Sequence, residues 1–341
     1  MRAVGYQSPQ PIDADNALVD IELPRPVVAG RDLLVEVRAV SVNPVDTKVR
    51  RNAAPAPGDW KVLGWDASGV VVEAGPDATL FKPGDEVFYA GALTRPGTNA
   101  EFHLVDERIV GHKPRSLDWA EAAAMPLTSI TAWEALFERL DVRGHEVPGA
   151  APAILIIGGA GGVGSMATQL ARRLTNLTVI ATASRPETAD WVRELGAHHV
   201  VDHRQPLAPQ VAALGIRAPA FVFSTTQTQL HLEQIAELIA PQGRLALIDD
   251  PASFDIGLFK RKSVSVHWEY MFTRSMFDTS DIAAQGQLLE EVSRLVDDGS
   301  LRSTLTGRLG TIDAATLKEA HRLLESGTAR GKLVLEGFPA A

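Results

Sequence analysis

Short apolar runs alternate with helix-like segments through the middle of the chain. The runs carry little polar alternation, which is typical of strands buried on both faces of a parallel sheet. They lie at 153–157, 177–183, 199–201, 220–224 and 244–248. Helical patterns stand between some of them, at 186–195 and 231–240. This order predicts an α/β fold whose centre is a doubly wound Rossmann sheet of five or six parallel strands.

The chain before about residue 115 has a different pattern, with short β-type runs separated by Gly and Pro. These runs lie at 32–42, 69–75, 85–90 and 100–105. Gly75-Pro76 and Pro83-Gly84 are turn signals between them. Many short strands at this spacing predict a compact, partly open, β-rich barrel.

A helical stretch from 116 to 140 follows the β-rich part. Ser116 is the expected N-cap of its first helix, the pattern breaks near Pro126, and Thr128 or Ser129 is expected to cap a second helix over 130–140. The tail shows helices near 285–297 and 314–326 and a last strand at 332–335, and we expect it to return to the first domain. The predicted domains are therefore 1–126, completed by 270–341, and a cofactor-binding domain at 127–269.

Residues 259–268 form a further predicted β run. Val264 and Val266 alternate there with Ser263, Ser265 and His267. An exposed strand with this alternation can pair with the same strand of a second subunit. We therefore expect a homodimer.

A glycine-rich turn follows the run at 153–157. Gly159, Gly161 and Gly164 have the G-x-G-x-x-G spacing, and a helix-like segment follows. The first glycine is expected to make the tight turn, the second to let backbone amides approach a pyrophosphate, and the third to let the helix pack closely. The predicted cofactor site at this helix N-terminus comprises Gly159, Ala160, Gly161, Gly162, Val163 and Gly164.

The end of the next run indicates which dinucleotide is preferred. A site that prefers NAD usually has an acidic residue there, but this chain has Ser184-Arg185. A hydroxyl and a guanidinium suit a ribose 2′-phosphate, so we expect NADP(H). The alternative is that Arg185 is an ordinary surface arginine. His203 lies in a following loop, which we expect near the adenine or ribose.

Composition narrows the classes of function. The formal net charge of −9 argues against nucleic acid or an anionic membrane as a partner. The chain has no cysteine, so disulfides, thiol nucleophiles and thiolate metal ligands are excluded, and we expect no bound metal. No apolar run approaches the ~18 residues of a membrane span, and no signal sequence is evident, so we expect a cytoplasmic protein.

With these motifs assembled, the chain resembles the medium-chain dehydrogenase/reductase superfamily, in particular its quinone-oxidoreductase-like branch and the zinc-type alcohol dehydrogenase-like proteins. The resemblance covers essentially the whole chain. It rests on the segments 41–47, 64–71, 81–87, 126–133, 159–164, 182–188 and 271–275. It implies a GroES-like, β-rich catalytic domain beside the Rossmann domain.

The resemblance also implies a zinc site that this sequence does not support. Zinc-dependent relatives have a cysteine where this chain has Asn43, a histidine at Trp65 and another cysteine near Leu127. Asp66 matches the acid beside the zinc-binding histidine, but one carboxylate does not hold a catalytic zinc. Polarisation of an alcohol or carbonyl by a metal is therefore not expected.

By resemblance, Asn43 and Asp46 would lie near the nicotinamide and substrate, and Thr131 would contact the nicotinamide or its ribose. The catalytic candidates are thus Asn43, Asp46, Asp66 and Thr131, and Ser224, Thr225 and Thr226 would border the cofactor. Aromatic candidates for the wall of a substrate cleft are Trp65, Tyr89, Trp268, Tyr270 and Phe272. The proton donor stays open between Asp46, Tyr89, His267 and solvent acting through a ribose hydroxyl.

The favoured hypothesis is a zinc-independent, NADPH-dependent oxidoreductase that transfers hydride to a quinone or an α,β-unsaturated carbonyl. Such small-molecule acceptors delocalise the incoming charge onto oxygen and need no metal. One alternative is an NADP(H)-binding redox sensor or structural protein with little turnover. A second alternative, a zinc-type alcohol dehydrogenase, is opposed by Asn43, Trp65 and the absence of cysteine.

Overall fold

The structure is a computed structural model that describes residues 1–339. The chain divides into two compact units, of which unit 1 comprises residues 1–130 and 272–341 and unit 2 comprises residues 131–271. Helix α3 (Pro126–Trp133) contains the first division point. Within the described part of the chain, no helix combines the length and apolar character needed to cross a membrane.

Unit 1 is built mainly from antiparallel strands. Its strands are β1 (Arg2–Tyr6), β2 (Val19–Glu22), β3 (Asp32–Ser41), β4 (Lys61–Val62), β5 (Asp66–Ala74), β6 (Glu86–Ala90), β7 (Phe102–Asp106), β8 (Val110–His112), β15 (Leu305–Gly310) and β16 (Lys332–Glu336). One sheet has the order β15-β16-β3-β5-β6-β8, with β7 also paired to β3, and a smaller sheet has the order β2-β1-β4. The predicted β-rich domain is confirmed.

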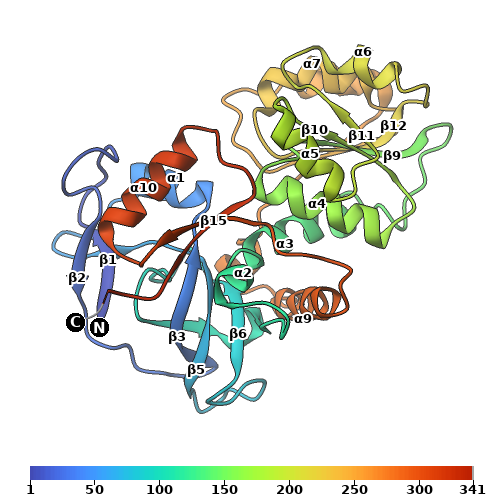
Figure 1. The fold of residues 1–341 in the computed structure, drawn as a ribbon. Helices are drawn as coiled ribbons and strands as arrows, with labels where there is room; N and C mark the ends of the chain where they lie inside the picture. The colour runs from blue at the N-terminus through green and yellow to red at the C-terminus, as the bar shows by residue number, and fades with distance from the viewer. Residues whose placement is uncertain (340–341) are drawn as a thin grey trace. The chain divides into compact units, whose positions relative to one another are not determined.

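The helices of unit 1 come from both of its chain segments. They are α1 (Pro44–Asn52), the short 3₁₀ turn η1 (Glu107–Ile109), α2 (Trp119–Ala123), α8 (Thr273–Phe277), α9 (Ala284–Asp297) and α10 (Ala314–Glu325). Helix α10, red in Figure 1, lies beside the blue α1, and Arg50 on α1 joins them by bonding to His321 and Glu325 on α10. Segments about 270 residues apart thus share one core.

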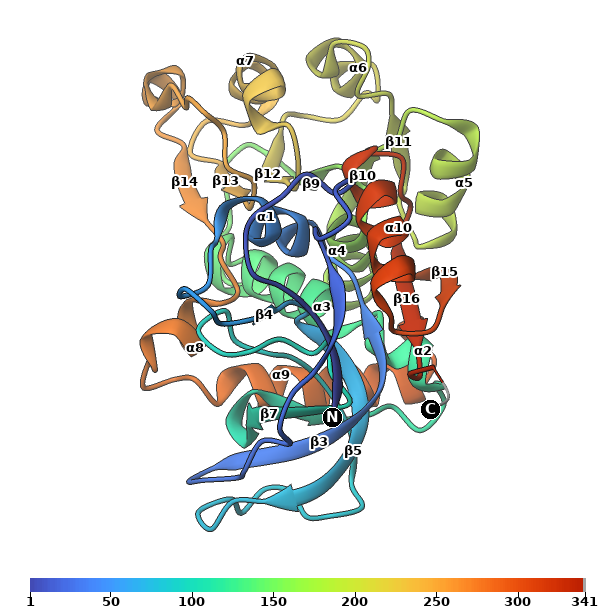
Figure 2. The ribbon, with the colours of Figure 1, turned by 90° about the vertical axis from the view of Figure 1, so that its left-hand side faces the viewer.

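Unit 2 contains the predicted parallel sheet. Its strands are β9 (Ala151–Ile157), β10 (Thr178–Thr182), β11 (His199–Val201), β12 (Pro219–Ser224), β13 (Arg244–Leu247) and β14 (Ser265–Trp268). All neighbouring pairs are parallel, and the order is β11-β10-β9-β12-β13-β14, which can be followed across Figure 2. This is the Rossmann order 3-2-1-4-5-6, so the α/β prediction is confirmed.

The remaining elements of unit 2 cover or connect this sheet. They are the π-helix η2 (Glu134–Arg139), α4 (Gly162–Leu174), α5 (Pro186–Glu194), α6 (Leu207–Ala212), α7 (Thr228–Leu238) and the 3₁₀ helix η3 (Ile256–Lys262). Leu155, Val222 and Leu245 from three neighbouring strands are fully buried and pack with Ile235 of α7. The apolar runs of the sequence are therefore buried as their lack of alternation predicts.

Three local predictions were wrong. Asp118, not Ser116, caps α2, because its carboxylate accepts from Glu121 N–H while the Ser116 hydroxyl donates to Asp297. Neither Thr128 nor Ser129 opens a helix, because α3 already begins at Pro126, a residue suited to the first turn. The helix predicted to reach residue 140 becomes the π-helix from Glu134.

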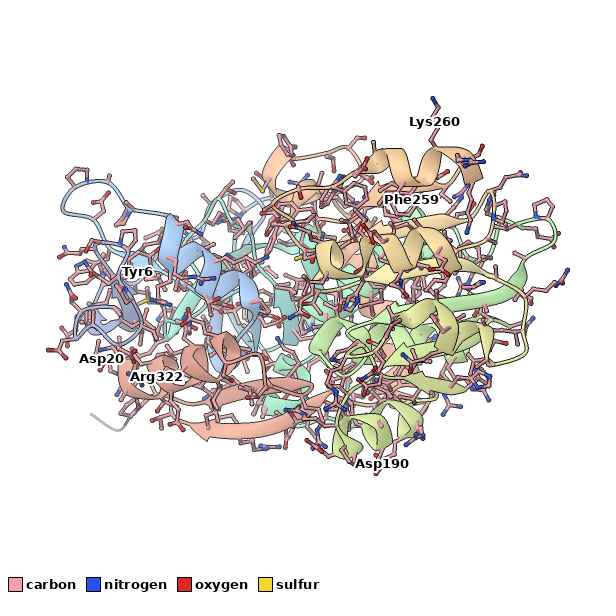
Figure 3. The ribbon with its side chains drawn as sticks, turned by 90° about the horizontal axis from the view of Figure 1, so that it is seen from above. Tyr6, Asp20, Asp190, Phe259, Lys260 and Arg322 are labelled. Carbon is pink, nitrogen blue, oxygen red and sulfur yellow. The ribbon has the colours of Figure 1, made fainter. Side chains whose placement is uncertain are left out.

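The β run predicted at 259–268 was too long. Residues 256–262 form η3, which buries Phe259 and leaves Lys260 exposed, as Figure 3 shows, and the strand is only Ser265–Trp268. The alternation of valine with polar residues is real over β14, which lies at one end of the sheet order. The sequence pattern located this edge strand but not its start.

Candidate functional site

A buried polar cluster joins three distant parts of unit 1. Lys332 Nζ lies 3.0 Å from Asp66 Oδ2, donates to Val42 O at 2.8 Å and also donates to Asn43 Oδ1. These side chains are at most 3% exposed. Asn43 and Asp66 were predicted from the sequence, whereas Lys332 was not, because a lysine that begins an otherwise apolar strand was its only signal.

Every polar atom of Asn43 has a partner within this cluster. Its amide nitrogen donates to Asp66 Oδ2 at 2.8 Å and to Ser41 O at 3.3 Å. The other oxygen of Asp66 accepts from Leu127 N–H at 2.7 Å. Rotation of the Asn43 side chain would break these buried hydrogen bonds. Asn43 therefore fixes the local backbone and the orientation of Asp66.

Asp46 lies in the first turn of α1, beside this cluster, and is fully buried. Its Oδ2 accepts from Asn43 N–H at 2.7 Å, a bond typical of the first turn of a helix. Burial raises the pKa of Asp46 to about 7, although the Asn43 N–H and the Lys332 charge act to lower it. Asp46 can therefore hold or release a proton near neutral pH, as a general acid must.

The aromatic candidates of unit 1 are core residues. Trp65 is 1% exposed, donates from Nε1 to Ala92 O at 3.2 Å, and packs edge-on against Phe272. The Tyr89 hydroxyl donates to His103 Nδ1 at 3.1 Å, because His103 Nε2 donates to Pro96 O. Burial raises the pKa of Tyr89 and lowers that of His103 to about 4, so both are neutral at pH 7.

The glycine turn of unit 2 joins β9 to α4 at the carboxyl edge of the parallel sheet. Gly158, which the sequence analysis did not single out, has the left-handed conformation with φ +78°. A Cβ on Gly164 would lie 2.2 Å from Gly158 O, so the helix approaches the turn as closely as predicted. A Cβ on Gly161 would meet only Gly158 O, at 3.5 Å. The space beside Gly161 therefore fits a bound pyrophosphate.

Residues that follow β10 lie next to this turn. The Thr182 hydroxyl accepts from Gly158 N–H at 2.9 Å and lies 3.3 Å from His203 Nδ1. Burial, together with the positive charges of Arg204 and Arg185, lowers the pKa of His203. Arg185 is the N-cap residue of α5, and its Nε lies 3.0 Å from the exposed Glu187 carboxylate.

The three hydroxyl residues at the end of β12 and just after it have different environments. Ser224 is fully buried and its hydroxyl lies 2.7 Å from that of Thr228. The Thr225 hydroxyl donates to Ile157 O at 2.8 Å, which places Thr225 against the glycine turn, whereas Thr226 is exposed. β9 and β12 are neighbours where the strand order reverses, and ligands of such sheets bind at this point.

The remaining predicted residues of unit 2 lie at its chain ends. Thr131 is 4% exposed, whereas Trp268 and Tyr270, which flank Glu269, are 54% and 48% exposed. The structure thus brings Asn43, Asp46 and Asp66 together in unit 1, and the glycine turn, Thr182, His203 and Thr225 together in unit 2.

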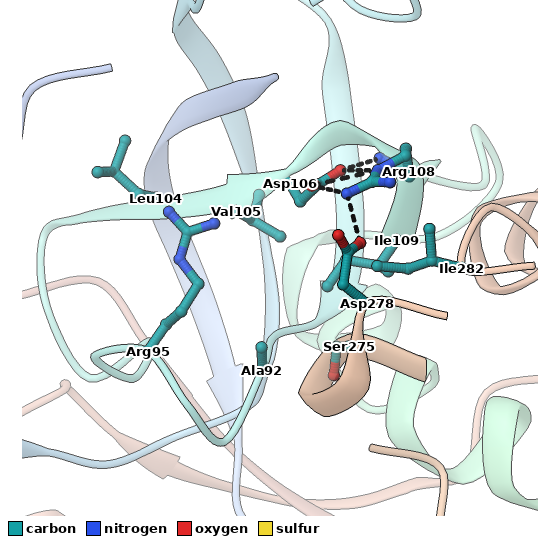
Figure 4. A pocket seen from close by; sticks show the side chains of 10 residues that line it. All are labelled: Ala92, Arg95, Leu104, Val105, Asp106, Arg108, Ile109, Ser275, Asp278 and Ile282. Carbon is teal, nitrogen blue, oxygen red and sulfur yellow. Dashed lines mark hydrogen bonds and ion pairs between the residues drawn. The ribbon is translucent and has the colours of Figure 1, made fainter. Parts of the chain in front are cut away.

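A separate cavity of about 260 Å³ lies in unit 1 and contains none of the predicted residues. Figure 4 shows Arg108 in it, with its guanidinium bonded to Asp106 and Asp278. The other arginine of the wall, Arg95, donates twice to Asp32 at 2.8 Å. The charges of both arginines are neutralised by carboxylates of the protein, so the cavity gives no indication of a ligand.

Two protein-family models match parts of this chain. The family model for the alcohol dehydrogenase GroES-like domain matches residues 29–124, and that for zinc-binding dehydrogenases matches residues 195–335. A zinc-type alcohol dehydrogenase-like protein of Staphylococcus aureus is 39% identical over 98% of this chain and 99% of its own. A GroES-like domain with a parallel Rossmann-type sheet defines an oxidoreductase of the medium-chain dehydrogenase/reductase type.

Two solved structures are similar over the whole chain. A Rhizobium etli protein assigned to the zinc-dependent alcohol dehydrogenases is 70% identical, with a TM-score of 0.98, 100% of this chain and 99% of that one covered. The quinone oxidoreductase of Coxiella burnetii is 26% identical, with a TM-score of 0.79, 98% and 99% covered. The chain belongs to the zinc-type alcohol dehydrogenase-like proteins of this superfamily.

The zinc in the names of these relatives does not fit the residues of this chain. A divalent cation beside Asp66 would face the Lys332 ammonium 3.0 Å from the same carboxylate, and Trp65 and Asn43 are not zinc ligands. Within residues 1–339, no three His, Cys, Asp or Glu side chains form a group that could hold a metal.

Lys332→Met tests the buried cluster. Removing the ammonium leaves the Asp66 carboxylate buried without its cation, which we expect to cost about 3–5 kcal/mol of unfolding free energy. The double variant Lys332→Met/Asp66→Asn should lose less than the sum of its two single variants, because the isolated charge is gone. Urea unfolding measures the free energy of unfolding of the single and double variants, and the exposed Lys82→Met is the control. If the losses of the two single variants add up to that of the double variant, Lys332 and Asp66 are not coupled.

Gly161→Val tests the turn. The added side chain meets little of the protein, so circular dichroism should show a folded chain, while fluorescence titration should show NADPH binding weakened at least about tenfold. Gly164→Ala is the contrasting variant, which should lower thermal stability because its Cβ would collide with Gly158 O. Wild-type NADPH affinity in Gly161→Val would show that the pyrophosphate binds elsewhere.

Proposed function

We propose that this protein is a zinc-independent, NADPH-dependent reductase of quinones or α,β-unsaturated carbonyl compounds. The observation that carries the proposal is the Lys332 ammonium beside Asp66, in the part of the family pattern where zinc-dependent relatives hold their metal. A reductase without a Lewis acid needs an acceptor that is already electrophilic, as quinones and enones are. The similar quinone oxidoreductase of Coxiella supports this class of acceptor.

The bound nicotinamide supplies a hydride, that is, two electrons and a proton. The chain's own residues bind the pyrophosphate at the turn, hold the ribose end and supply or relay one further proton to the reduced acceptor. Asp46 is the proton source that we favour, because its pKa lies near 7, whereas the Tyr89 hydroxyl donates to His103 and has a raised pKa. A quinone accepts this proton on oxygen and an enone on carbon.

The preference for NADPH is proposed from Ser184 and Arg185 at the end of β10. Both residues are partly exposed, and no acidic residue stands between Thr182 and Pro186. The exposed Glu187 is the present partner of Arg185, and a 2′-phosphate of higher charge would compete with it for the guanidinium. This arrangement favours a phosphate over a free 2′-hydroxyl.

One observation favours the sensor alternative. Asn43 and Tyr89 have their polar atoms bonded within unit 1 and offer no donor to an acceptor molecule in this arrangement. A protein that binds NADP(H) at the turn but reduces nothing would then be a redox sensor or structural protein. An assay of NADPH oxidation distinguishes this alternative from the reductase.

We further propose a homodimer that forms through β14. Within residues 1–339, β14 pairs with β13 only, and the exposed Trp268 of β14 adds apolar surface. Sedimentation velocity tests this, since a monomer at micromolar concentration would contradict it. A cytoplasmic location and a small-molecule partner remain predictions from the sequence.

The experiment that tests the function is the loss of NADPH absorbance with a panel of quinones, enones and aldehydes, on protein assayed for zinc. We expect turnover with a quinone or enone in metal-free protein and little with simple aldehydes, which need polarisation. Tight NADPH binding without oxidation across the panel would replace the reductase by the sensor. Turnover that requires added zinc would restore the alcohol dehydrogenase alternative.

Arg185→Ala tests the cofactor preference. Loss of a charge-assisted contact should raise the KM for NADPH about 10- to 100-fold and leave that for NADH nearly unchanged. Arg193→Ala, on the same helix and paired with Asp190, is the matched control and should change neither KM. Equal effects of Arg185→Ala on the two cofactors would exclude a phosphate contact.

A further inference from the structure

A buried arginine joins two helices of unit 1. Arg50 lies in the last turn of α1, and its side chain is fully buried. Its Nε donates to His321 Nδ1 at 3.2 Å, its Nη1 to Gln10 O, and its Nη2 to the Glu325 carboxylate. His321 and Glu325 lie about one turn apart on α10. Because a buried charge is tolerated only with such partners, Arg50 fastens α1 to α10 and to the loop at Gln10.

The bond from Arg50 fixes the state of His321. A ring nitrogen that accepts a hydrogen bond carries no proton, so His321 is neutral and its proton is on Nε2. Burial and the Arg50 charge lower the pKa of His321 to about 3, so the ring stays neutral at every pH of an ordinary assay. The Glu325 carboxylate, 23% exposed, is thus the countercharge of Arg50.

The segment that carries α10 meets the start of α1 a second time. Seven residues after Glu325, Lys332 donates from Nζ to Asn43 Oδ1, and Asn43 is the N-cap residue of α1. Asn43 N–H in turn donates to Asp46 Oδ2 at 2.7 Å. The C-terminal segment therefore contacts α1 at both ends, and Asp46 lies between the two contacts.

Asp46 and Arg50 lie on the same face of α1. They are four residues apart, which is about one helical turn. Both are fully buried, and Thr47 beside Asp46 is buried as well. Without the guanidinium, Glu325 would lose its countercharge and Gln10 O its donor, so water would have to enter along this face. That water would lie one turn from Asp46.

We propose that Arg50 is a positioning residue of the reductase, which holds α1 against α10 and thereby keeps the Asp46 carboxyl buried and bonded to Asn43 N–H. The proposal rests on the proposed function, in which Asp46 supplies a proton to the reduced acceptor. Arg50 acts through Asp46 and transfers no proton itself, because a guanidinium stays protonated in proteins. Its contribution to the reaction is to keep water away from the proton donor.

The direction of the effect separates positioning from a simple charge effect. Lys332 of β16 and Asp66 of β5 are the charged groups that act on Asp46, and burial raises its pKa more than either of them changes it. Loss of a nearby positive charge, such as that of Arg50, would by itself raise the pKa of Asp46. Entry of water would lower this pKa from about 7 toward its ordinary value of 3.8. A lowered pKa of Asp46 therefore indicates lost burial.

Arg50→Met is the decisive variant. Methionine fills most of the space but cannot donate a hydrogen bond. We expect kcat at pH 7 to fall about tenfold and its alkaline decline to begin at lower pH, because Asp46 loses its proton earlier. The NADPH Kd, which we assign to the glycine turn of unit 2, should keep its wild-type value. A wild-type pH profile in folded Arg50→Met would overturn the proposal.

Arg51→Met is the matched control. Arg51 is the next residue of α1, its side chain is 53% exposed, and its Nε lies 3.9 Å from the same Glu325 carboxylate. The substitution removes an equal charge from the same helix without opening the buried face, so kcat and its pH profile should match the wild type. A shift as large as that of Arg50→Met would assign the effect to charge and contradict a positioning role.

A double variant shows whether Arg50 acts through Asp46. Asp46→Asn removes the proton donor, while its amide oxygen can still accept from Asn43 N–H. In this background Arg50→Met should lower kcat no further, although Tm should still fall. A merely structural role of Arg50 would lower kcat by the same factor in both backgrounds.

Arg50→Lys is the conservative variant and should fold even if Arg50→Met does not. Lysine keeps the charge and can reach Glu325, but it lacks the fork that serves His321 and Gln10 at the same time. The alkaline decline of kcat should therefore still begin at lower pH than in the wild type, with a smaller shift than in Arg50→Met. If Arg50→Met does not fold, a wild-type profile in Arg50→Lys overturns the proposal.

Infrared spectroscopy follows the Asp46 proton without any acceptor. The wild type minus Asp46→Asn difference should contain a protonated-carboxyl band, whose loss with rising pH gives the midpoint for Asp46. The same difference in the Arg50→Met background should have a lower midpoint, and an unchanged midpoint would exclude the positioning role. If no acceptor is reduced while the midpoint falls, the reductase is wrong and the positioning of Asp46 by Arg50 stands.

Discussion

The buried ion pair between Lys332 and Asp66 is the contact on which unit 1 depends. The unit is made from two segments separated by the whole of unit 2, and the sheet brings them together because β16 pairs with β3 and β3 with β5. Val334 lies opposite Ser41, and Ser41 lies opposite Asp66, so this register places Lys332 near the carboxylate. Two buried charges are tolerated only with good mutual geometry and further hydrogen bonds.

That constraint also decides what chemistry the cluster can support. Lys332, Asn43, Ser41 and the Leu127 N–H use the donors and acceptors around Asp66, so a fixed positive charge is present without a metal. The Lys332 charge acts to lower the pKa of Asp46, but burial raises this pKa more strongly, so it lies near 7. The same set of contacts that completes the fold therefore opposes a zinc site and leaves a carboxyl able to carry a proton.

Unit 2 follows the same physical rule by a different means. Glu269 is buried there, and Arg139 Nε lies 2.9 Å from its Oε2. At the glycine turn, no side chain within residues 1–339 caps the start of α4, and a Cβ on Gly161 would meet only Gly158 O, so an anion has room to approach the first N–H groups of the helix. A lysine thus pairs with a buried carboxyl group in unit 1 and an arginine with one in unit 2, whereas the space beside Gly161 remains available to an anion.

The two fold classes, the parallel strands of unit 2 and the position of the glycine turn could all be predicted from the sequence alone. These follow from local rules: apolar runs without alternation are buried on both faces, and G-x-G-x-x-G permits close backbone approach. It did not locate the start of β14, the cap at Asp118 or the left-handed Gly158, because neighbouring residues compete for such local roles. Lys332 could not be recognised as a cluster member either, since a lone charged residue in a sequence has no visible partner. The partners of Lys332 are visible only in the folded protein, because burial and strand register bring together residues that lie up to 290 positions apart.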